Sequence, residues 1–373
     1  MAILLTENCI GCGACQTACL PGCIELRRDE MGFLRAYISE NGCTGCGRCK
    51  IVCPQLRSRR ASPKIVFAYQ NPNQTDLDSS QSGGAFLALA RTVIENNGIV
   101  YGVKWNQGCT RAEFAGATTI AQLRAFSGSK YVSADLSCVL QEIKKEVITG
   151  RVVLFSGLPC QVAAVRNLFP HRENLVLVEV LCMGPMSPEV WKRLRQHMPL
   201  NLSNFLFRDK SRRGWGKADS QYEFSNGTRQ SFCSERFPAW KIFSTGVTMS
   251  SSCTNCKFRS FERTADITIG DFWGIEHLLK VPDEVSRKGI SIVHAQTAIG
   301  KKYLFSLENG FLGRFTDLES IRKFNLGYQQ IGCDMKLRQK SFINFSCRVG
   351  IPVSVMVISL LSKYGHRFPK YFK

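Results

Sequence analysis

The residues with the clearest chemistry are cysteines, which form two runs near the start of the chain. Each run has the spacing C-x2-C-x2-C-x3-C, and Pro54 directly follows the second run. This spacing lets three thiolates in one loop bind one iron–sulfur cube, while the fourth, beyond the start of a helix, reaches the other cube. The predicted ligands are Cys9, Cys12, Cys15 and Cys53 for one [4Fe–4S] cluster, and Cys43, Cys46, Cys49 and Cys19 for the other.

Two alternatives to this assignment stay open. Sets of four cysteines also bind zinc, although zinc requires neither duplicated triplets nor glycines between the ligands. After Cys19 the proline comes one position late, at Pro21, and a further thiol follows at Cys23. The spacing favours Cys19 as the remote ligand of the second cluster, and Cys23 is its alternative.

Two more cysteines follow predicted strands. Residues 151–181 predict a βαβ unit, a strand followed by a helix that starts at Pro159 and then by a second strand. The two strands of such a unit are parallel, so Cys160 and Cys182 follow their carboxyl ends, at the edge where α/β sheets bind ligands. We also expect the helix N-terminus to favour the thiolate form of Cys160.

A C-x2-C pair at Cys253 and Cys256 can join these two thiols, and strand-like residues 266–270 and a turn at residues 271–274 follow it. From spacing alone, the four thiols fit a third [4Fe–4S] cluster, a zinc site, or cysteines that bind no metal.

Two glycines precede another predicted helix. Gly83 and Gly84 come before residues 85–97, a helical pattern that lies between strand patterns at residues 64–70 and 99–103. Backbone N–H groups at such a helix start can hold a phosphate, and an ordinary tight turn fits the same residues equally well. The sequence has neither a G-x-G-x-x-G motif after a strand nor a P-loop, so it does not support a standard NAD site or a P-loop.

The composition is that of a folded chain with a basic surplus. Of the 373 residues, 44% are hydrophobic and 21% are charged, which excludes a disordered or low-complexity protein. The net charge of +20 indicates an anionic partner.

The first residues lack the basic stretch of a secretion signal, and the apolar residues 349–361 fall short of the roughly 20 that span a bilayer. With 18 cysteines, we expect a reducing, cytoplasmic setting.

Two basic segments allow two interpretations each. Residues 208–217 are either a solvated loop or a clamp for an anionic substrate tail or flavin phosphates. Residues 336–373 alternate apolar and basic blocks, which is typical of a peripheral membrane or partner contact and equally of a helix packed on the core. Nucleic-acid recognition is not indicated, because the sequence contains no basic recognition helix or zinc finger.

The ordered series of motifs resembles the coenzyme F420 hydrogenase/dehydrogenase beta-subunit family, behind an N-terminal ferredoxin domain. The resemblance covers residues 1 to about 290 in the family's order. Two positions depart from the family, which often has Thr at Leu158 and His at Met183, and this leaves the substrate open. The matching segments are Ser82-Gly83-Gly84, Val100-Tyr101-Gly102, Gly128-Ser129-Lys130-Tyr131-Val132, residues 157–161, Cys182-Met183-Gly184, the Cys253–Cys256 pair and residues 266–274.

The resemblance implies a flavin-binding core, usually with FAD, that passes electrons between iron–sulfur clusters and a bound hydride acceptor such as coenzyme F420. It implies Lys130 as the residue that stabilises charge near the reduced flavin ring, the alternative being a surface lysine. The ligands implied for a third [4Fe–4S] cluster are Cys160, Cys182, Cys253 and Cys256. The segments implied to line the flavin site or to close its cluster side contain Gly83, Gly84, Ser129, Lys130, Tyr131, Asp271 and Trp273.

We therefore expect three domains. Residues 1–62 form an α+β ferredoxin-like domain, residues 63–300 an α/β flavin-binding core with a partly parallel sheet, and residues 301–373 a basic helical extension. The expected function is that of an iron–sulfur flavoprotein oxidoreductase, whose partner is a redox protein or a small hydride acceptor. The alternative is an electron-transfer subunit that has no substrate of its own and serves a partner enzyme.

Overall fold

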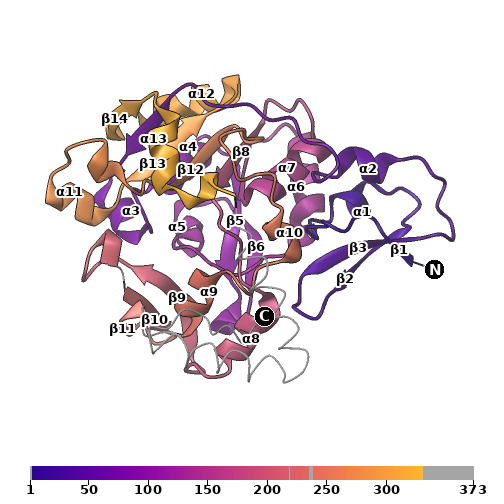
Figure 1. Ribbon diagram of the computed structural model, residues 1–373, viewed down its shortest axis with the longest axis horizontal. Helices are drawn as coiled ribbons and strands as arrows, with labels where there is room; N and C mark the ends of the chain where they lie inside the picture. The colour runs from indigo at the N-terminus through magenta and orange to yellow at the C-terminus, as the bar shows by residue number, and fades with distance from the viewer. Residues whose placement is uncertain (1, 218, 235–237, 331–373) are drawn as a thin grey trace.

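The computed structural model describes residues 2–217, 219–234 and 238–330. In this part the chain forms an N-terminal module, a large central sheet with helices around it, and a small second sheet (Figure 1). The predicted basic extension lies largely outside the described residues, including all of residues 336–373. No helix in the described ranges has the length and apolar character needed to cross a membrane.

The N-terminal module is a three-stranded antiparallel sheet covered by two short helices. Its strands run in the order β1-β3-β2, and the two helices pack against each other. Each helix begins after a glycine in the left-handed conformation, Gly13 (φ 77°) and Gly47 (φ 72°), which other residues adopt only with strain. These glycines stand between the second and third cysteine of each triplet, so they turn the chain around a common centre. The elements are β1 (Ala2–Leu4), α1 (Ala14–Ala18), β2 (Ile24–Arg28), β3 (Leu34–Ser39) and α2 (Arg48–Val52).

The central sheet has eight strands in the order β14-β4-β13-β12-β8-β7-β5-β6. Its middle strands, β5, β7, β8 and β12, are parallel, and the outer pairings are antiparallel. The prediction of a mixed α/β fold with a partly parallel sheet is therefore confirmed. The strands are β4 (Val66–Tyr69), β5 (Ile99–Trp105), β6 (Ala112–Ala117), β7 (Val153–Gly157), β8 (Leu175–Val180), β12 (Ile267–Asp271), β13 (Ser291–Ala295) and β14 (Phe311–Phe315).

The predicted βαβ unit is present as β7, α7 and β8. Both strands are almost entirely buried, which matches their continuous apolar sequence, and α7 starts at Pro159, whose fixed φ suits the first helical position.

The helices after the N-terminal module are α3 (Gln74–Ser79), α4 (Ala85–Glu95), α5 (Ile120–Leu123), α6 (Leu140–Ile148), α7 (Pro159–Leu168), α8 (Pro188–Arg195), α9 (Pro238–Thr245), α10 (Ser251–Thr254), α11 (Asp283–Lys288), α12 (Ala298–Leu304) and α13 (Leu318–Phe324).

The second sheet was not predicted from the sequence. It is antiparallel and consists of β9 (Leu202–Asp209), β10 (Asp219–Phe224) and β11 (Arg229–Phe232). Its apolar face meets α8 in an aromatic cluster, where the rings of Trp105 and Trp191 stack at 4.9 Å and both lie near Phe205 and Phe207. This cluster holds β9 against the central sheet.

The N-terminal module is joined to the core by close contacts. A Cβ at Gly13 would lie 2.5 Å from the Cβ of Ser137, so α1 approaches the core backbone too closely for any side chain there. Ser187 Oγ donates a 2.5 Å hydrogen bond to the carbonyl of Met31 in the β2–β3 turn, and Asn167 Nδ2 donates to the carbonyl of Arg57 at 2.8 Å. These contacts hold the module's cysteines in a defined position relative to α7.

Candidate metal centres and cofactor cavity

The first predicted cluster set is gathered in the interior. Cys9, Cys12, Cys15 and Cys53 all have exposed fractions below 10%. Burial raises the pKa of Cys15 to about 12, and the neighbouring thiols of Cys9 and Cys53 raise it further. Burial likewise raises the pKa of Cys12 and Cys53, with Cys9 again contributing. Since each thiol disfavours the charge of the next, all four lie around one centre, and a bound cation would reverse this penalty.

The second set lies at the surface. Cys43 and Cys46 are exposed, and Cys19 and Cys49 are half-buried. A fifth thiol, Cys23, is buried among them, and its pKa is raised by burial and then by Cys19, Cys43 and Cys46. The structure therefore brings Cys23 as well as Cys19 to this centre, and the choice between them as remote ligand stays a prediction.

The third set is also brought together, although its members come from three separate segments. Cys160 is in the first turn of α7, Cys182 follows β8, Cys253 is in α10, and Cys256 follows α10. Burial strongly raises the pKa of Cys160, and Cys256, Cys182 and Cys253 add to the rise. The expectation that the helix start favours a thiolate at Cys160 is wrong for the metal-free chain, because loss of solvation and three neighbouring thiols outweigh the helix dipole.

The three thiol sets are neighbours in space. Cys49 of the second set contributes to the raised pKa of Cys15 in the first. Cys12 of the first set contributes to the raised pKa of Cys160 in the third. The first set therefore stands between the other two.

All-thiolate sets suit iron–sulfur clusters, and no three His, Cys, Asp or Glu side chains in the described ranges lie close enough to hold a single metal ion. Two backbone N–H groups, from Gly11 and Ala36, donate to Cys9 Sγ at 3.4 and 3.3 Å. Gly184 N–H donates to Cys182 Sγ at 3.2 Å. Such hydrogen bonds stabilise charge on sulfur, so the residues present fit clusters held by thiolates.

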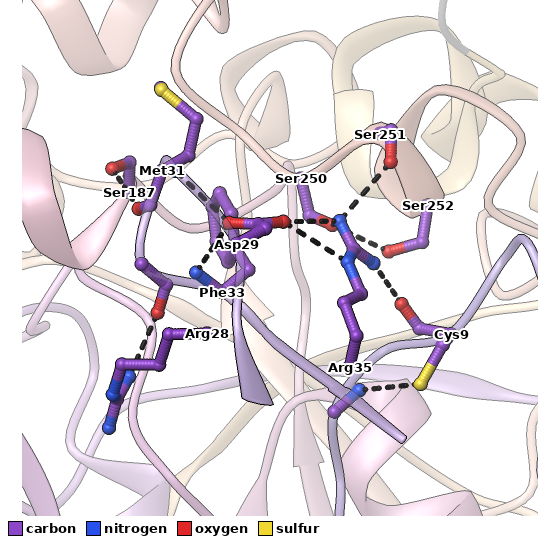
Figure 2. Close-up of polar contacts among 12 residues, drawn as sticks. Cys9, Arg28, Asp29, Met31, Phe33, Arg35, Ser187, Ser250, Ser251 and Ser252 are labelled. Carbon is purple, nitrogen blue, oxygen red and sulfur yellow. Dashed lines mark hydrogen bonds and ion pairs between the residues drawn. The ribbon is translucent and has the colours of Figure 1, made fainter. Parts of the chain in front are cut away.

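Arg35 connects the first set to the third. Figure 2 shows its guanidinium, which is buried, between Asp29 and the serines that begin α10. It forms an ion pair with Asp29 at 3.0 Å and donates to Ser250 Oγ at 3.0 Å and Ser251 Oγ at 3.2 Å. It also donates to the carbonyl oxygen of Cys9. The sequence analysis missed Arg35, because a basic residue in a strand carries no signal of its buried partners.

A cavity of about 640 Å³ opens where the parallel strands end. Its wall includes Gly157 of β7, Leu181 after β8, and Gly270 of β12, so it lies at the carboxyl edge where α/β sheets bind ligands. Cys182 of the third thiol set also lines it. Both departures from the family pattern, Leu158 and Met183, lie on this wall as well.

Six of the seven residues predicted for the flavin site line this cavity, namely Gly84, Ser129, Lys130, Tyr131, Asp271 and Trp273. Gly83 is not on the wall, and a Cβ there would lie 2.2 Å from the carbonyl oxygen of Tyr69. Its role is therefore to let the turn before α4 pack tightly on the sheet. Gly84 caps α4 with a φ of 78°, a conformation that suits glycine.

The cavity wall contains polar atoms that have no protein partner. Gln81 Oε1 and Ser127 Oγ are buried without a hydrogen bond, and both residues line the cavity. Leaving such atoms unpaired costs about 1–3 kcal/mol each. A polar ligand in the cavity would satisfy them.

Lys130 is held in place by the backbone. Its ammonium donates to the carbonyl oxygens of Ala125 at 2.8 Å and Ser127 at 2.7 Å. Burial lowers the pKa of Lys130 to about 7, and the nearby Cys109 partly opposes this shift. A group with this pKa can hold or release a proton at neutral pH.

The basic segment at residues 208–217 contributes a buried side chain to the cavity. Arg208 is the second-to-last residue of β9 and forms an ion pair with Asp271 at 2.7 Å, while its guanidinium lies 5.0 Å from the Trp273 ring centre. Trp215 donates to the other oxygen of Asp271 at 2.7 Å and stacks on Trp273 at 4.5 Å. The solvated-loop interpretation is wrong for Arg208 and for Lys210, both of which are buried.

Comparison with known proteins gives two family matches. Residues 8–56 match the 4Fe-4S dicluster domain, and residues 150–314 match the C-terminal part of the coenzyme F420 hydrogenase/dehydrogenase beta subunit. Among solved structures, a chain of the F420-reducing [NiFe] hydrogenase complex from Methanosarcina barkeri is similar at 17% identity and a TM-score of 0.48, covering 78% of this chain and 94% of that chain. No curated protein matches.

Proposed function

We propose that the chain, whose residues 150–314 match the C-terminal part of the coenzyme F420 hydrogenase/dehydrogenase beta subunit and whose residues 8–56 match the 4Fe-4S dicluster domain, is an iron–sulfur flavoprotein oxidoreductase. In this proposal it passes electrons between [4Fe–4S] clusters and a flavin-bound hydride donor or acceptor. The substrate class is coenzyme F420 or another small hydride carrier.

The single observation that carries the proposal is the position of Cys182. Its thiol belongs to the third cysteine set and its residue lines the cavity. A cluster on that set would therefore adjoin whatever the cavity binds. Electron transfer needs such closeness, whereas a purely structural metal site does not.

The cavity residues suit a planar redox cofactor. Tyr131 stacks on Phe243 at 4.2 Å, and Trp273, with 36% of its surface exposed, offers another ring on the wall. Gln81 and Ser127 would hydrogen bond to the ligand's polar edge. The chemistry that a flavin supplies when bound is the exchange of one hydride for two single electrons.

The chain's own residues would have distinct tasks at that site. Lys130, on its two backbone acceptors, would hold positive charge or a proton near the ring. Arg208 is neutralised by Asp271, so this pair would orient the ligand more than attract it. Leu158 and Met183 make the wall beside the third thiol set apolar.

Anaerobic purification followed by iron, sulfide and flavin quantification tests the proposal. We expect about twelve irons and one flavin per chain, with broad visible absorption. About eight irons without flavin would refute the enzyme proposal and leave the second candidate, an electron-transfer subunit that serves a partner enzyme. The exposure of Cys43 and Cys46 favours that candidate as a specific observation, since it suits exchange with another protein. A colourless, zinc-containing protein would refute both.

A further inference from the structure

The second thiol set is the part of the electron route nearest to solvent. Figure 1 shows the connection between β3 and α2, which carries Cys43 and Cys46, at the outer edge of the N-terminal module, away from the central sheet. Residues 40–46 are all exposed. An electron that enters or leaves the chain through clusters would therefore do so at this edge.

The order of the thiol sets supports this. Cys49 of the second set lies near Cys15 of the first, and Cys12 of the first lies near Cys160 of the third. The third set reaches the cavity wall through Cys182. Clusters on these sets would form a line from the outer edge to the cavity, and the second set would be its exposed end.

The surface around this end combines exposed apolar and basic side chains. Leu20, Ile51 and Leu56 have exposed fractions of 76%, 50% and 49%, and each lies within three residues of a cysteine of the first or second set. From residue 41 to residue 75 the chain contains no Asp or Glu. The exposed basic residues of this stretch are Arg48, Lys50, Arg57, Arg59, Arg60 and Lys64.

We propose that this outer face, made of Leu20, Arg48, Lys50 and Ile51 beside the cysteines of the second set, is the docking site of an acidic one-electron carrier protein. The inference rests on the proposed function. The basic charge attracts an acidic partner and repels a second copy of this chain. The exposed apolar side chains supply contact area that a free ion or a polar polymer would not use.

The redox step balances with one electron. The reduced carrier loses one electron, and the cluster at the outer face gains it. Two such events and one proton supply the hydride equivalent that leaves at the cavity. The co-reactant is thus a reduced protein carrier.

A charge-reversal experiment tests the docking site. Holoprotein is mixed in a stopped-flow instrument with a reduced acidic flavodoxin, and oxidation of the flavodoxin is followed at several salt concentrations. The test variant is Arg48→Glu/Lys50→Glu, and the matched control is Lys301→Glu/Lys302→Glu on α12, which carries the same charge change at a distant exposed site. Dithionite, a small reductant, reports whether each variant's clusters still accept electrons.

We expect the second-order rate constant of the wild type to fall as salt rises. At low salt the test variant should be about tenfold slower or more, and the control should stay within about twofold of wild type. All three should contain equal iron and react equally with dithionite. Equal slowing of test and control would overturn the inference, because net charge alone would then explain the rate.

Two further results would also overturn it. One is a salt-independent rate that is the same in wild type and test variant. The other is binding to anionic lipid vesicles that the test variant loses while its rate with flavodoxin is unchanged, which would assign the face to a membrane. Failure of the proposed function would look different, because a chain without flavin can still take electrons from the carrier at its outer face.

Discussion

Replacement of Arg35 by Met would weaken the contact between the N-terminal module and the core at a single residue. The methionine keeps most of the apolar stem and removes the guanidinium that joins Asp29, the Cys9 carbonyl and the serines at the start of α10 (Figure 2). We expect β3 to unfold locally more easily, because the Cys9 carbonyl beside the first thiol set and the serines beside the third set both lose the guanidinium that donates to them.

The magnitude follows from the contacts that are lost. The side chains of Arg35 and Asp29 are 11% and 31% exposed, so their ion pair lies between a surface pair and a buried one and contributes about 1–2 kcal/mol. Asp29 keeps hydrogen bonds from Met31 N and Phe33 N at 3.1 and 2.9 Å, which limits the loss. The acceptors that lose a donor add about 1–2 kcal/mol together. Local unfolding of β3 breaks all of these contacts, inside the module and to the core, so its free energy should fall by about 3 kcal/mol, or roughly a hundredfold in the opening equilibrium.

Anaerobic hydrogen exchange of the holoprotein measures this opening. Slowly exchanging amides of β3 should exchange roughly a hundredfold faster in Arg35→Met. The matched control is Arg27→Met, which removes an ion pair of 2.7 Å to Glu25 between side chains that are 50% and 64% exposed. Its exchange should change by about threefold at most. Unchanged exchange in Arg35→Met, with normal iron content, would refute the reasoning that this residue joins the two parts.

Four other variants give distinct outcomes. Cys256→Ala should lower the iron content by about four per chain and leave the N-terminal clusters spectroscopically intact, and an unchanged content would exclude Cys256 as a ligand. Cys19→Ser and Cys23→Ser should differ in iron content, with the true remote ligand losing about four irons and the other cysteine losing none. Burial lowers the pKa of Lys130 to about 7, so its ammonium is charged below that pH and neutral above it. The flavin potential of Lys130→Met should therefore lie below that of wild type at about pH 6 and converge with it at about pH 8, and potentiometry that finds a constant difference would contradict this.

Local sequence patterns predicted much of the fold. The alternation of apolar runs and a proline at residue 159 was enough to predict the buried strands and the parallel unit β7–α7–β8. The second sheet escaped prediction because β9 is held by Trp105 and Trp191, which are far apart in the sequence and meet only when α8 folds over β5. Arg208 escaped for the same reason, since its partner Asp271 comes from β12.

The sequence by itself determined which thiols lie close together within each N-terminal run. Thiols at fixed short spacings must converge locally, because a few residues of chain cannot separate them, and the family resemblance could be seen in motif order alone. Only the tertiary structure decided how the three thiol sets, the cavity and Arg35 lie relative to one another. It set the first thiol set between the other two, brought Cys182 to both the third set and the cavity, and buried Arg35 between module and core. Those neighbours are set by packing between distant segments, and no local spacing encodes them.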